Sequence, residues 1–376
     1  MKIVQAFINK NKKWFYATEK VLLNNPLVLV FGERELLEES DTIDNIRAEF
    51  PYEHIVFGSS AGEIFGTTII ENSITVVAVE FEKTSFVVKT ANILDYNKNT
   101  EEAAAFLSSQ MPQEGLKHLL IISEGSFISG SNLIRGLQKN VNTAIPITGG
   151  LCGDGSKFEK TIVSYKENPK EGEIALIGLY GESLEVSFST YCSFIPFGPN
   201  RIITKSEGNT VYEIDGQPAL DLYKKYLGEK ADEPQFTLLY PLHTIVPGKS
   251  EGVVRTILSV DNDKNAMIFA DEMIQGSKVQ LMMVSQDAII EGADRAAKIA
   301  MDNRKDKPQL VFVVSCIGRK LIMAQRVEEE VEQVAEIVGK GVALAGFYSY
   351  GEISPSSKEQ LCELHNETMA LTLISE

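Results

Sequence analysis

Continuous apolar runs alternate with amphipathic segments along most of the chain, and this alternation predicts strands and helices in turn. The runs VLVF (28–31), HLLIIS (118–123) and QLVFVVSC (309–316) are typical of strands that are buried on both faces. Residues 33–50 carry apolar side chains near helical spacing among charged ones, and Pro51 closes the segment, which predicts a helix. The chain therefore opens with a strand, a helix and a strand.

Two pairs of predicted strands are separated by only a few polar residues. EKT (82–84) lies between residues 74–81 and 85–93, and GES (181–183) joins the segment EIALIGLYG, which ends at residue 181, to residues 184–190. Both spacings predict antiparallel hairpins, so we expect mixed sheets. The predicted fold class is α/β (α+β), with two related halves, each a mixed β-sheet covered by helices.

Residues 191–218 are rich in proline and glycine, and their hydrophobic periodicity is weak. This composition predicts a connection between two domains, over residues 26–215 and 216–376. Pro218 is suited to the first turn of a helix that ends at Gly228 and opens the second domain.

The net charge of −16 over 376 residues argues against nucleic acid or an anionic membrane as a partner, because both repel an acidic surface. The four cysteines are far apart and form no CxxC pair, so the sequence indicates neither a zinc site nor a disulfide framework. No apolar run is long enough for a membrane span or a secretion signal. We expect a cytoplasmic protein with no membrane association and no bound metal.

Two similar segments, FGSSAGEI (57–64) and GFYSYGEISP (346–355), each follow a short apolar run. Both combine glycine, hydroxyl residues and a Gly-Glu-Ile sequence, which places Glu63 and Glu352 at equivalent positions of a duplicated unit. Ligands often bind where strands of an open α/β sheet end. We therefore expect the two turns to meet across one cleft that holds a small polar ligand.

A third segment, GGLCGDG (149–155), is the most glycine-dense part of the chain. Its backbone N–H groups could cradle an anion. It lacks the Gly-Lys-Ser/Thr ending of a phosphate loop and the spacing of a dinucleotide fingerprint, so we expect no nucleotide. Asp154 could orient a ligand amine, but we favour a role in holding its own turn.

Several segments resemble, in the same order, the FIST proteins, whose name joins F-box and intracellular signal transduction. They are FGSSAGEI, the RGL at 135–137, GGLCGDG, the FGP and ITK segments around 197–205, EIDGQPALDLY, VSCIGR, GFYSYGEISP and HNET. The resemblance covers the chain from about residue 26 onward. It implies a sensory protein with FIST N and FIST C parts that binds a small ligand, such as an amino acid, and acts through a signalling partner such as a histidine kinase or a cyclic-dinucleotide enzyme.

The predicted ligand-binding residues lie in or beside these segments. They are Ser59, Ser60, Glu63, Gly149, Gly150, Cys152, Asp154, Cys316, Arg319, Tyr348, Tyr350, Glu352, His365 and Asn366. Carboxylates are suited to a ligand ammonium group, tyrosines to a cation and the arginine to a carboxylate. The alternatives are structural: loop caps for the glutamates, a salt bridge for the arginine, and core positions for the tyrosines and the histidine.

Two other functions remain open at this point. Some FIST proteins are haem-binding nitric oxide sensors, but the sequence has no CxxCH, and a single axial histidine cannot be recognised from sequence. Cys152 or Cys316 could be the nucleophile of an acyl- or amide-transfer enzyme, but no histidine is placed beside either one. We expect a binding protein with no cofactor rather than an enzyme.

Overall fold

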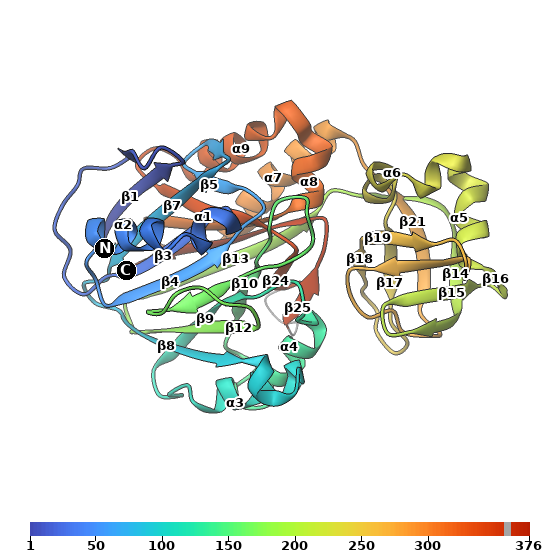
Figure 1. The fold of residues 1–376 in the computed structure, drawn as a ribbon, viewed down its shortest axis with the longest axis horizontal. Coiled ribbons are helices and arrows are strands. Elements are labelled where there is room, and N and C mark those ends of the chain that lie inside the picture. Colours follow the sequence, from blue (N-terminus) through green and yellow to red (C-terminus); the bar gives the residue numbers. More distant parts are fainter. Residues whose placement is uncertain (357–361) are drawn as a thin grey trace.

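The computed structural model describes residues 1–356 and 362–376, which form a large body and a smaller module beside it (Figure 1). Three six-stranded sheets with helices build the body, and residues 195–283 build the module around one eight-stranded sheet. Parallel and antiparallel pairs occur in each sheet of the body. The predicted mixed α/β fold class is confirmed.

The three sheets of the body are drawn from distant parts of the chain. The first contains β11 (Val163–Tyr165), β4 (His54–Ser59), β3 (Leu27–Gly32), β7 (Ser73–Glu80), β1 (Lys2–Asn9) and β2 (Trp14–Tyr16), in that order. The second contains β25 (Cys362–His365), β24 (Gly351–Pro355), β10 (Ile147–Leu151), β9 (Leu116–Ser123), β12 (Glu173–Tyr180) and β8 (Ser85–Asn92). The third contains β13 (Glu185–Cys192), β26 (Thr368–Ser375), β22 (Leu310–Cys316), β23 (Ala343–Ser349), β5 (Glu63–Phe65) and β6 (Thr68–Ile70).

One arrangement of strands occurs three times in the body. A central strand (β3, β9 or β22) has a parallel neighbour on one side (β4, β10 or β23) and an antiparallel neighbour on the other (β7, β12 or β26). We call these units 1, 2 and 3; they cover residues 1–80, residues 85–180, and residues 185–192 together with the described part of 286–376. The two turns that resemble each other in sequence belong to units 1 and 3, and the GGLCGDG segment is the corresponding turn of unit 2.

Each unit completes the sheet of another unit with a short strand. β5 of unit 1 pairs with β23, β11 of unit 2 pairs with β4, and β24 of unit 3 pairs with β10, all antiparallel. The exchange is cyclic, so none of the three sheets is complete without two units.

Backbone hydrogen bonds join the turns where these short strands leave their units. The N–H of Ala61 donates to Tyr348 O at 2.8 Å, that of Gly153 to Ser59 O at 3.3 Å, and that of Tyr350 to Leu151 O at 3.0 Å. The turns meet so closely that a β-carbon on Gly153 would lie 2.9 Å from the β-carbon of Ala61 and 3.1 Å from the Tyr350 ring. Only glycine therefore fits at residue 153, where the turns of the three units meet.

The inner faces of the three sheets share one apolar core. Phe31 of β3 stacks on Phe347 of β23 with a centroid distance of 4.4 Å and lies 5.7 Å from Phe312 of β22, and Ile122 of β9 belongs to the same cluster. The outer faces carry separate clusters, each shared with the helices of one unit. Strands covered in this way need apolar residues on both faces, which explains the continuous runs in the sequence.

The helices of the body cover the outer faces. They are α1 (Arg34–Glu38) and α2 (Ser40–Glu49) in unit 1, α3 (Thr100–Ser109) and α4 (Gly130–Leu137) in unit 2, and α7 (Gln286–Met301), α8 (Ile317–Met323) and α9 (Glu328–Val338) in unit 3, with the short 3₁₀ helices η1 (Ile93–Tyr96) and η3 (Ala324–Arg326). The helix expected from residue 33 is present but divided by a break into α1 and α2, and the helix expected from residue 218 is present in the module as Ala219–Leu227. No helix in the described ranges is both long and apolar enough to cross a membrane.

The two predicted hairpins are wrong, although their four strands exist. β7 and β8 lie in different sheets, as do β12 and β13. Both edges of β7 are already occupied, by β1 and β3, and both edges of β12 by β8 and β9. The short connections therefore carry the chain from one unit to the next.

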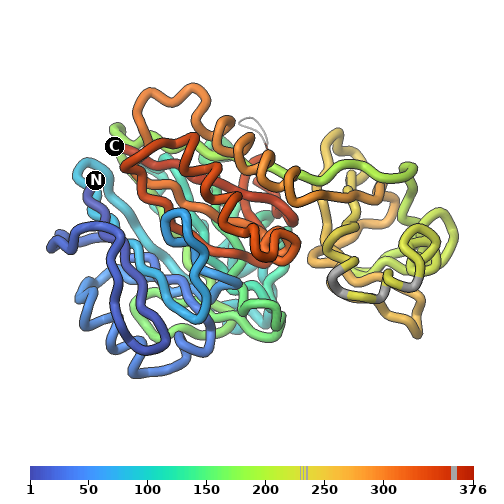
Figure 2. The backbone as a smooth tube through the Cα atoms, turned by 90° about the horizontal axis from the view of Figure 1, so that it is seen from above, coloured from blue at the N-terminus to red at the C-terminus, as the bar shows by residue number. Residues whose placement is uncertain are grey.

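The module is inserted in unit 3 between β13 and α7, and Figure 2 shows it set off from the body, to which two chain segments join it. Its strands are β14 (Ile195–Glu207), β15 (Thr210–Ile214), β16 (Gln217–Pro218), β17 (Leu242–Ile245), β18 (Val253–Arg255), β19 (Ile257–Asp261), β20 (Ala266–Phe269) and β21 (Lys278–Met283), and its helices are α5 (Ala219–Leu227), η2 (Gly228–Asp232) and α6 (Pro234–Leu239). The proline- and glycine-rich segment 191–218 thus holds strands, including the long and largely exposed β14. The two chain ends lie together away from the module, with the Met1 amino group 3.3 Å from Glu376.

Replacing Gly149 tests the close approach of β10 to the central strand of unit 2. Gly149 has φ +136°, and an added β-carbon would lie 1.9 Å from the backbone oxygen of Ile121. We expect Gly149→Ala to lower the free energy of unfolding by about 3 kcal/mol or more in urea denaturation. Gly115→Ala is the control, because Gly115 has φ +75° with no atom nearby and should cost only about 1 kcal/mol. Equal losses in the two variants would contradict this account.

Candidate functional site

A cleft of about 550 Å³ opens where parts of all three units meet. The turn 60–63 of unit 1 forms one side, the loop 154–157 of unit 2 another, and α8 with the residues after it, from unit 3, the third. We call it the turn cleft. Its acidic residues are Glu33, Glu63, Glu71 and Asp154, its basic residues are Lys157 and Lys320, and its apolar wall consists of Ile317, Leu321, Ala324 and Val327.

Glu63 lines the turn cleft but is tied to its own unit. The hydroxyls of Ser60 and Ser73 lie 2.5 Å and 3.0 Å from its two carboxyl oxygens. Burial is the main cause that raises the pKa of Glu63 to about 8, against an ordinary value of 4.5. At neutral pH the carboxyl is therefore mostly protonated and neutral.

Glu352 repeats this arrangement in unit 3. The hydroxyls of Ser349 and Thr368 lie 2.5 Å and 2.9 Å from its carboxyl oxygens, and burial again raises its pKa to about 8. In both units the glutamate joins the turn to the first residue of the antiparallel neighbour strand. Glu352 is fully buried and does not line the turn cleft, so the structure does not bring the two glutamates together across it.

Lys320 joins the helical wall of the turn cleft to the turn of unit 1. Its ammonium group donates to the backbone oxygen of Ala61 at 2.7 Å, forms an ion pair with Glu71 at 2.6 Å, and lies 5.8 Å from the centre of the Tyr348 ring. Sequence reasoning singled out Arg319 and missed the next residue, Lys320. It also missed Glu33, which lines the turn cleft without a direct ion pair to any described residue and acts electrostatically on Lys157 of the same cleft.

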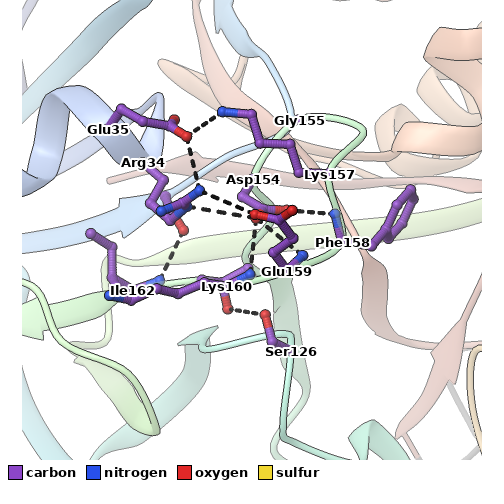
Figure 3. A network of polar contacts seen from close by, with 12 residues as sticks. Arg34, Glu35, Ser126, Asp154, Gly155, Lys157, Phe158, Glu159, Lys160 and Ile162 are labelled. Carbon is purple, nitrogen blue, oxygen red and sulfur yellow. Dashed lines mark hydrogen bonds and ion pairs between the residues drawn. The ribbon is translucent and has the colours of Figure 1, made fainter.

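Asp154 holds the loop on the unit 2 side of the turn cleft, as Figure 3 shows. Its carboxylate accepts the backbone N–H groups of Phe158 at 2.9 Å, Glu159 at 3.2 Å and Lys160 at 2.9 Å, and it also accepts the Tyr350 hydroxyl. The Phe158 ring stacks on the Tyr350 ring at 4.5 Å. These contacts support the turn-holding role that we favoured from the sequence.

Arg34 and Lys157 link this loop to α1. The Arg34 guanidinium lies 3.6 Å from the Asp154 carboxylate and 2.8 Å from Glu35, with which Lys157 also pairs (Figure 3). The loop of unit 2 is therefore fixed to unit 1 on its outer side. Asp154 and Lys157, which make these ties, also line the turn cleft.

The opposite face of α8 is buried against other parts of unit 3. The Arg319 guanidinium forms a fully buried ion pair with Glu330 at 2.6 Å and reaches the hydroxyl of Ser193 at 3.3 Å. Tyr348 donates its hydroxyl to the same Glu330 at 2.6 Å. Arg319 and Tyr348 thus lie beneath the wall of the turn cleft. Both of their side chains bond to the same buried carboxylate, that of Glu330.

The other predicted site residues lie around the same turns but do not line the turn cleft. Burial raises the pKa of the Cys152 and Cys316 thiols well above their ordinary value, so both are protonated at neutral pH. The ring of His365 is buried with Nε2 3.0 Å from Ser354 O, and burial lowers its pKa to about 4. The described residues contain no group of three or more histidine, cysteine or acidic side chains that could hold a metal ion.

The small residues among the predicted set serve close packing. The Ser59 hydroxyl accepts the backbone N–H of Ile162 at 3.0 Å. Gly149 and Gly150 lie in β10, where a β-carbon on Gly150 would come within 2.6 Å of Val314. The amide of Asn366 reaches the backbone oxygen of Tyr350 only at 3.5 Å. All of these residues lie within the junction of the three units.

Comparison with protein families matches two models to this chain. The FIST N domain model matches residues 26–217, and the FIST C domain model matches residues 219–355. The boundary between the two matches falls inside the module, between β16 and α5.

Curated relatives match over parts of their length. An uncharacterised protein of Methanocaldococcus jannaschii is 25% identical over 251 residues, which are 59% of this chain and 47% of the archaeal protein. An uncharacterised protein of Mycobacterium tuberculosis is 25% identical over 267 residues, which are 68% of this chain and 67% of the relative. An uncharacterised protein of Mycobacterium bovis is also 25% identical, over 272 residues. This chain therefore spans about half the length of the archaeal relative.

The raised pKa of Glu63 predicts that stability depends on pH. The folded state holds this proton more tightly than the unfolded state, so the contribution is full below about pH 4.5 and is lost as pH rises through about 8. Glu63→Gln keeps a neutral group of the same shape at every pH. Relative to the natural protein, we expect the variant to gain about 2 kcal/mol in free energy of unfolding between pH 6 and pH 8.

Urea denaturation over this pH range measures the difference. Glu114→Gln is the control, because Glu114 is exposed and the variant should follow the natural protein at every pH. A stability difference between Glu63→Gln and the natural protein that stays constant with pH would show that the carboxyl is already ionised in the fold.

Proposed function

The chain belongs to the FIST family, whose domains are assigned to sensory signal transduction, and we propose that it senses a small polar molecule bound in the turn cleft. The ligand would carry a cationic amino group, which makes amino acids and related amines the first candidates. The observation that carries this proposal is a cleft of ligand size, about 550 Å³, whose wall carries the Glu33 carboxylate without a direct ion pair to a described residue.

The charges of the turn cleft favour a ligand of this kind. Glu33 forms no direct ion pair with a described residue, although its charge acts on Lys157 from a distance. Glu71 forms an ion pair with Lys320. A ligand ammonium group could bind Glu33, and a ligand carboxylate could compete with Glu71 for Lys320. The apolar wall formed by Leu321, Ala324 and neighbouring residues would cover an aliphatic part of the ligand.

The position of α8 supports a route from binding to signal. One face of α8 carries Lys320 and Leu321 to the turn cleft, and the other carries Ile322 to a small apolar cluster with Phe194, at the start of the module. Gly318 packs against Glu367, whose carboxylate accepts the hydroxyl of Thr256 from the module at 2.8 Å. A ligand that prefers one position of α8 would favour one position of the module relative to the body. Only such a preference for one of two arrangements can transmit a signal.

The receiver of this signal would be a separate protein. The family implies a histidine kinase or a cyclic-dinucleotide enzyme as the class of partner. The module is the element most exposed to such a partner, because it projects from the body (Figure 2).

A thermal-shift screen tests the binding proposal. The panel consists of the standard amino acids other than lysine, arginine and histidine, together with putrescine, each with its fully N-acetylated form, in which every ammonium group is lost. A binder at 100 times its dissociation constant should stabilise the protein by about 2.7 kcal/mol, and its acetylated form should not. Glu33→Gln and Lys320→Met should weaken the response at least about tenfold in affinity.

The matched controls are Glu114→Gln and Lys340→Met, which change the same residue types at exposed positions outside the cleft. Both should respond as the natural protein does. A panel with no binder, or a binder whose affinity is the same in Glu33→Gln and Lys320→Met, would contradict the assignment of the turn cleft.

A further inference from the structure

A second hollow, of about 340 Å³, lies between the module and the body and is not used by the function proposed above. α4 and β25 form its body side, and the hairpin of β17 and β18 forms much of its module side. We call it the module pocket. Ligand sites are frequent both at domain interfaces and at open ends of curved sheets, and this pocket lies at such an interface.

Thr244 supplies the main sign that the module pocket takes a ligand. In the pairing of β17 with β18, Thr244 is opposite Val253 and Leu242 is opposite Arg255, so Thr244, Val253 and Arg255 point to one face. All three line the pocket. Thr244 is only 3% exposed, and its hydroxyl has no hydrogen-bond partner among the described residues. A buried hydroxyl without a hydrogen-bond partner costs free energy of folding. We therefore expect a bound ligand to supply the missing hydrogen bond.

The walls around Thr244 are mainly apolar. They comprise Ile134 of α4, Leu364 of β25, and Val246, Val253 and Ile274 of the module. Such a lining contributes binding free energy in proportion to the apolar surface that a ligand buries. A single hydroxyl among apolar side chains then sets the orientation of the ligand.

The charged residues of the module pocket are largely paired with one another. Arg135 pairs with Glu272 at 3.4 Å, Lys249 pairs with Glu363, and Arg255 pairs with Asp271 at 3.4 Å. The remaining acidic residue of the lining, Glu251, is exposed at the rim. Each basic residue of the lining already has an acidic partner, so a charged ligand would have to displace that partner.

We propose that the module pocket binds an uncharged small molecule with an apolar body and one hydroxyl or carbonyl group, which hydrogen-bonds to Thr244. The ligand contacts the body and the module at once. It therefore adds to the hydrogen bonds that hold the module against the body, such as the one that Arg255 donates to the backbone oxygen of Leu364 at 2.9 Å. The module pocket is a second input, separate from the turn cleft.

Three probes of equal size and different charge test the proposal: benzyl alcohol, benzoate and benzylamine. Binding to the full chain is measured by saturation-transfer NMR titration. We expect benzyl alcohol to bind at least about tenfold more tightly than either charged probe, because neither finds an unpaired ion in the pocket. Thr244→Val removes the hydroxyl without changing the shape and should weaken benzyl alcohol about three- to tenfold.

Thr190→Val is the matched control, because Thr190 also has a buried hydroxyl without a partner but lies in β13, outside the pocket. It should leave binding unchanged. Ile274→Trp fills the pocket from a position that is 39% exposed and should abolish binding, whereas Ile202→Trp, at 41% exposure elsewhere on the module, should not.

The proposal is overturned by any of three results. They are no binding of benzyl alcohol at millimolar concentration, equal affinity for the three probes, or an affinity that neither Thr244→Val nor Ile274→Trp changes. Lys320→Met should bind benzyl alcohol as the natural protein does, which separates this site from the turn cleft. Thermal melting of each variant confirms that it is folded.

Discussion

The cyclic exchange of short strands is the constraint on which the body depends. Each unit closes the sheet of a neighbour, and the hydrogen bonds from Ala61, Gly153 and Tyr350 fix the three turns to one another. The turns are therefore buried, and their polar groups must find partners inside the protein. This explains why Glu63 and Glu352 are each bonded to two hydroxyls of their own unit. The turn cleft lies at the edge of the junction rather than at its centre.

Much of the fold could be predicted from the sequence, for one physical reason. The central strands are covered on both faces, so they are continuous apolar runs that are visible without any partner. Which strands pair with one another could not be predicted in the same way. Residues 74–93 have the pattern of a hairpin, but β7 already has two neighbours, one of them from the start of the chain. The module was missed because β14 is mostly exposed and has no regular alternation.

The sequence indicated the turns that border the turn cleft, but not the residues that form most of its walls. The repeated Gly-Glu turns led to the junction of the units, but most of the predicted residues do not line the turn cleft. The third turn was not recognised as a repeat because Cys152 stands where the other turns have Ser60 and Ser349. Lys320, Glu33 and Glu71 gave no signal, since charged residues beside strands are common and only the fold brings these three to one wall. Burial of the glutamates, which sets their pKa values, also depends on parts of the chain far from them.

The exchange of strands has a consequence for the growing chain on the ribosome. β10 emerges early, but its neighbour β24 is among the last strands made, and the whole module is synthesised between them. Until then the edge of β10 has no partner, and an open edge of an apolar sheet readily pairs with another chain. Most contacts that close the body are also distant in sequence, which slows folding. A nascent or truncated chain of this architecture should therefore depend on chaperones, and premature termination should yield aggregates rather than a functional fragment.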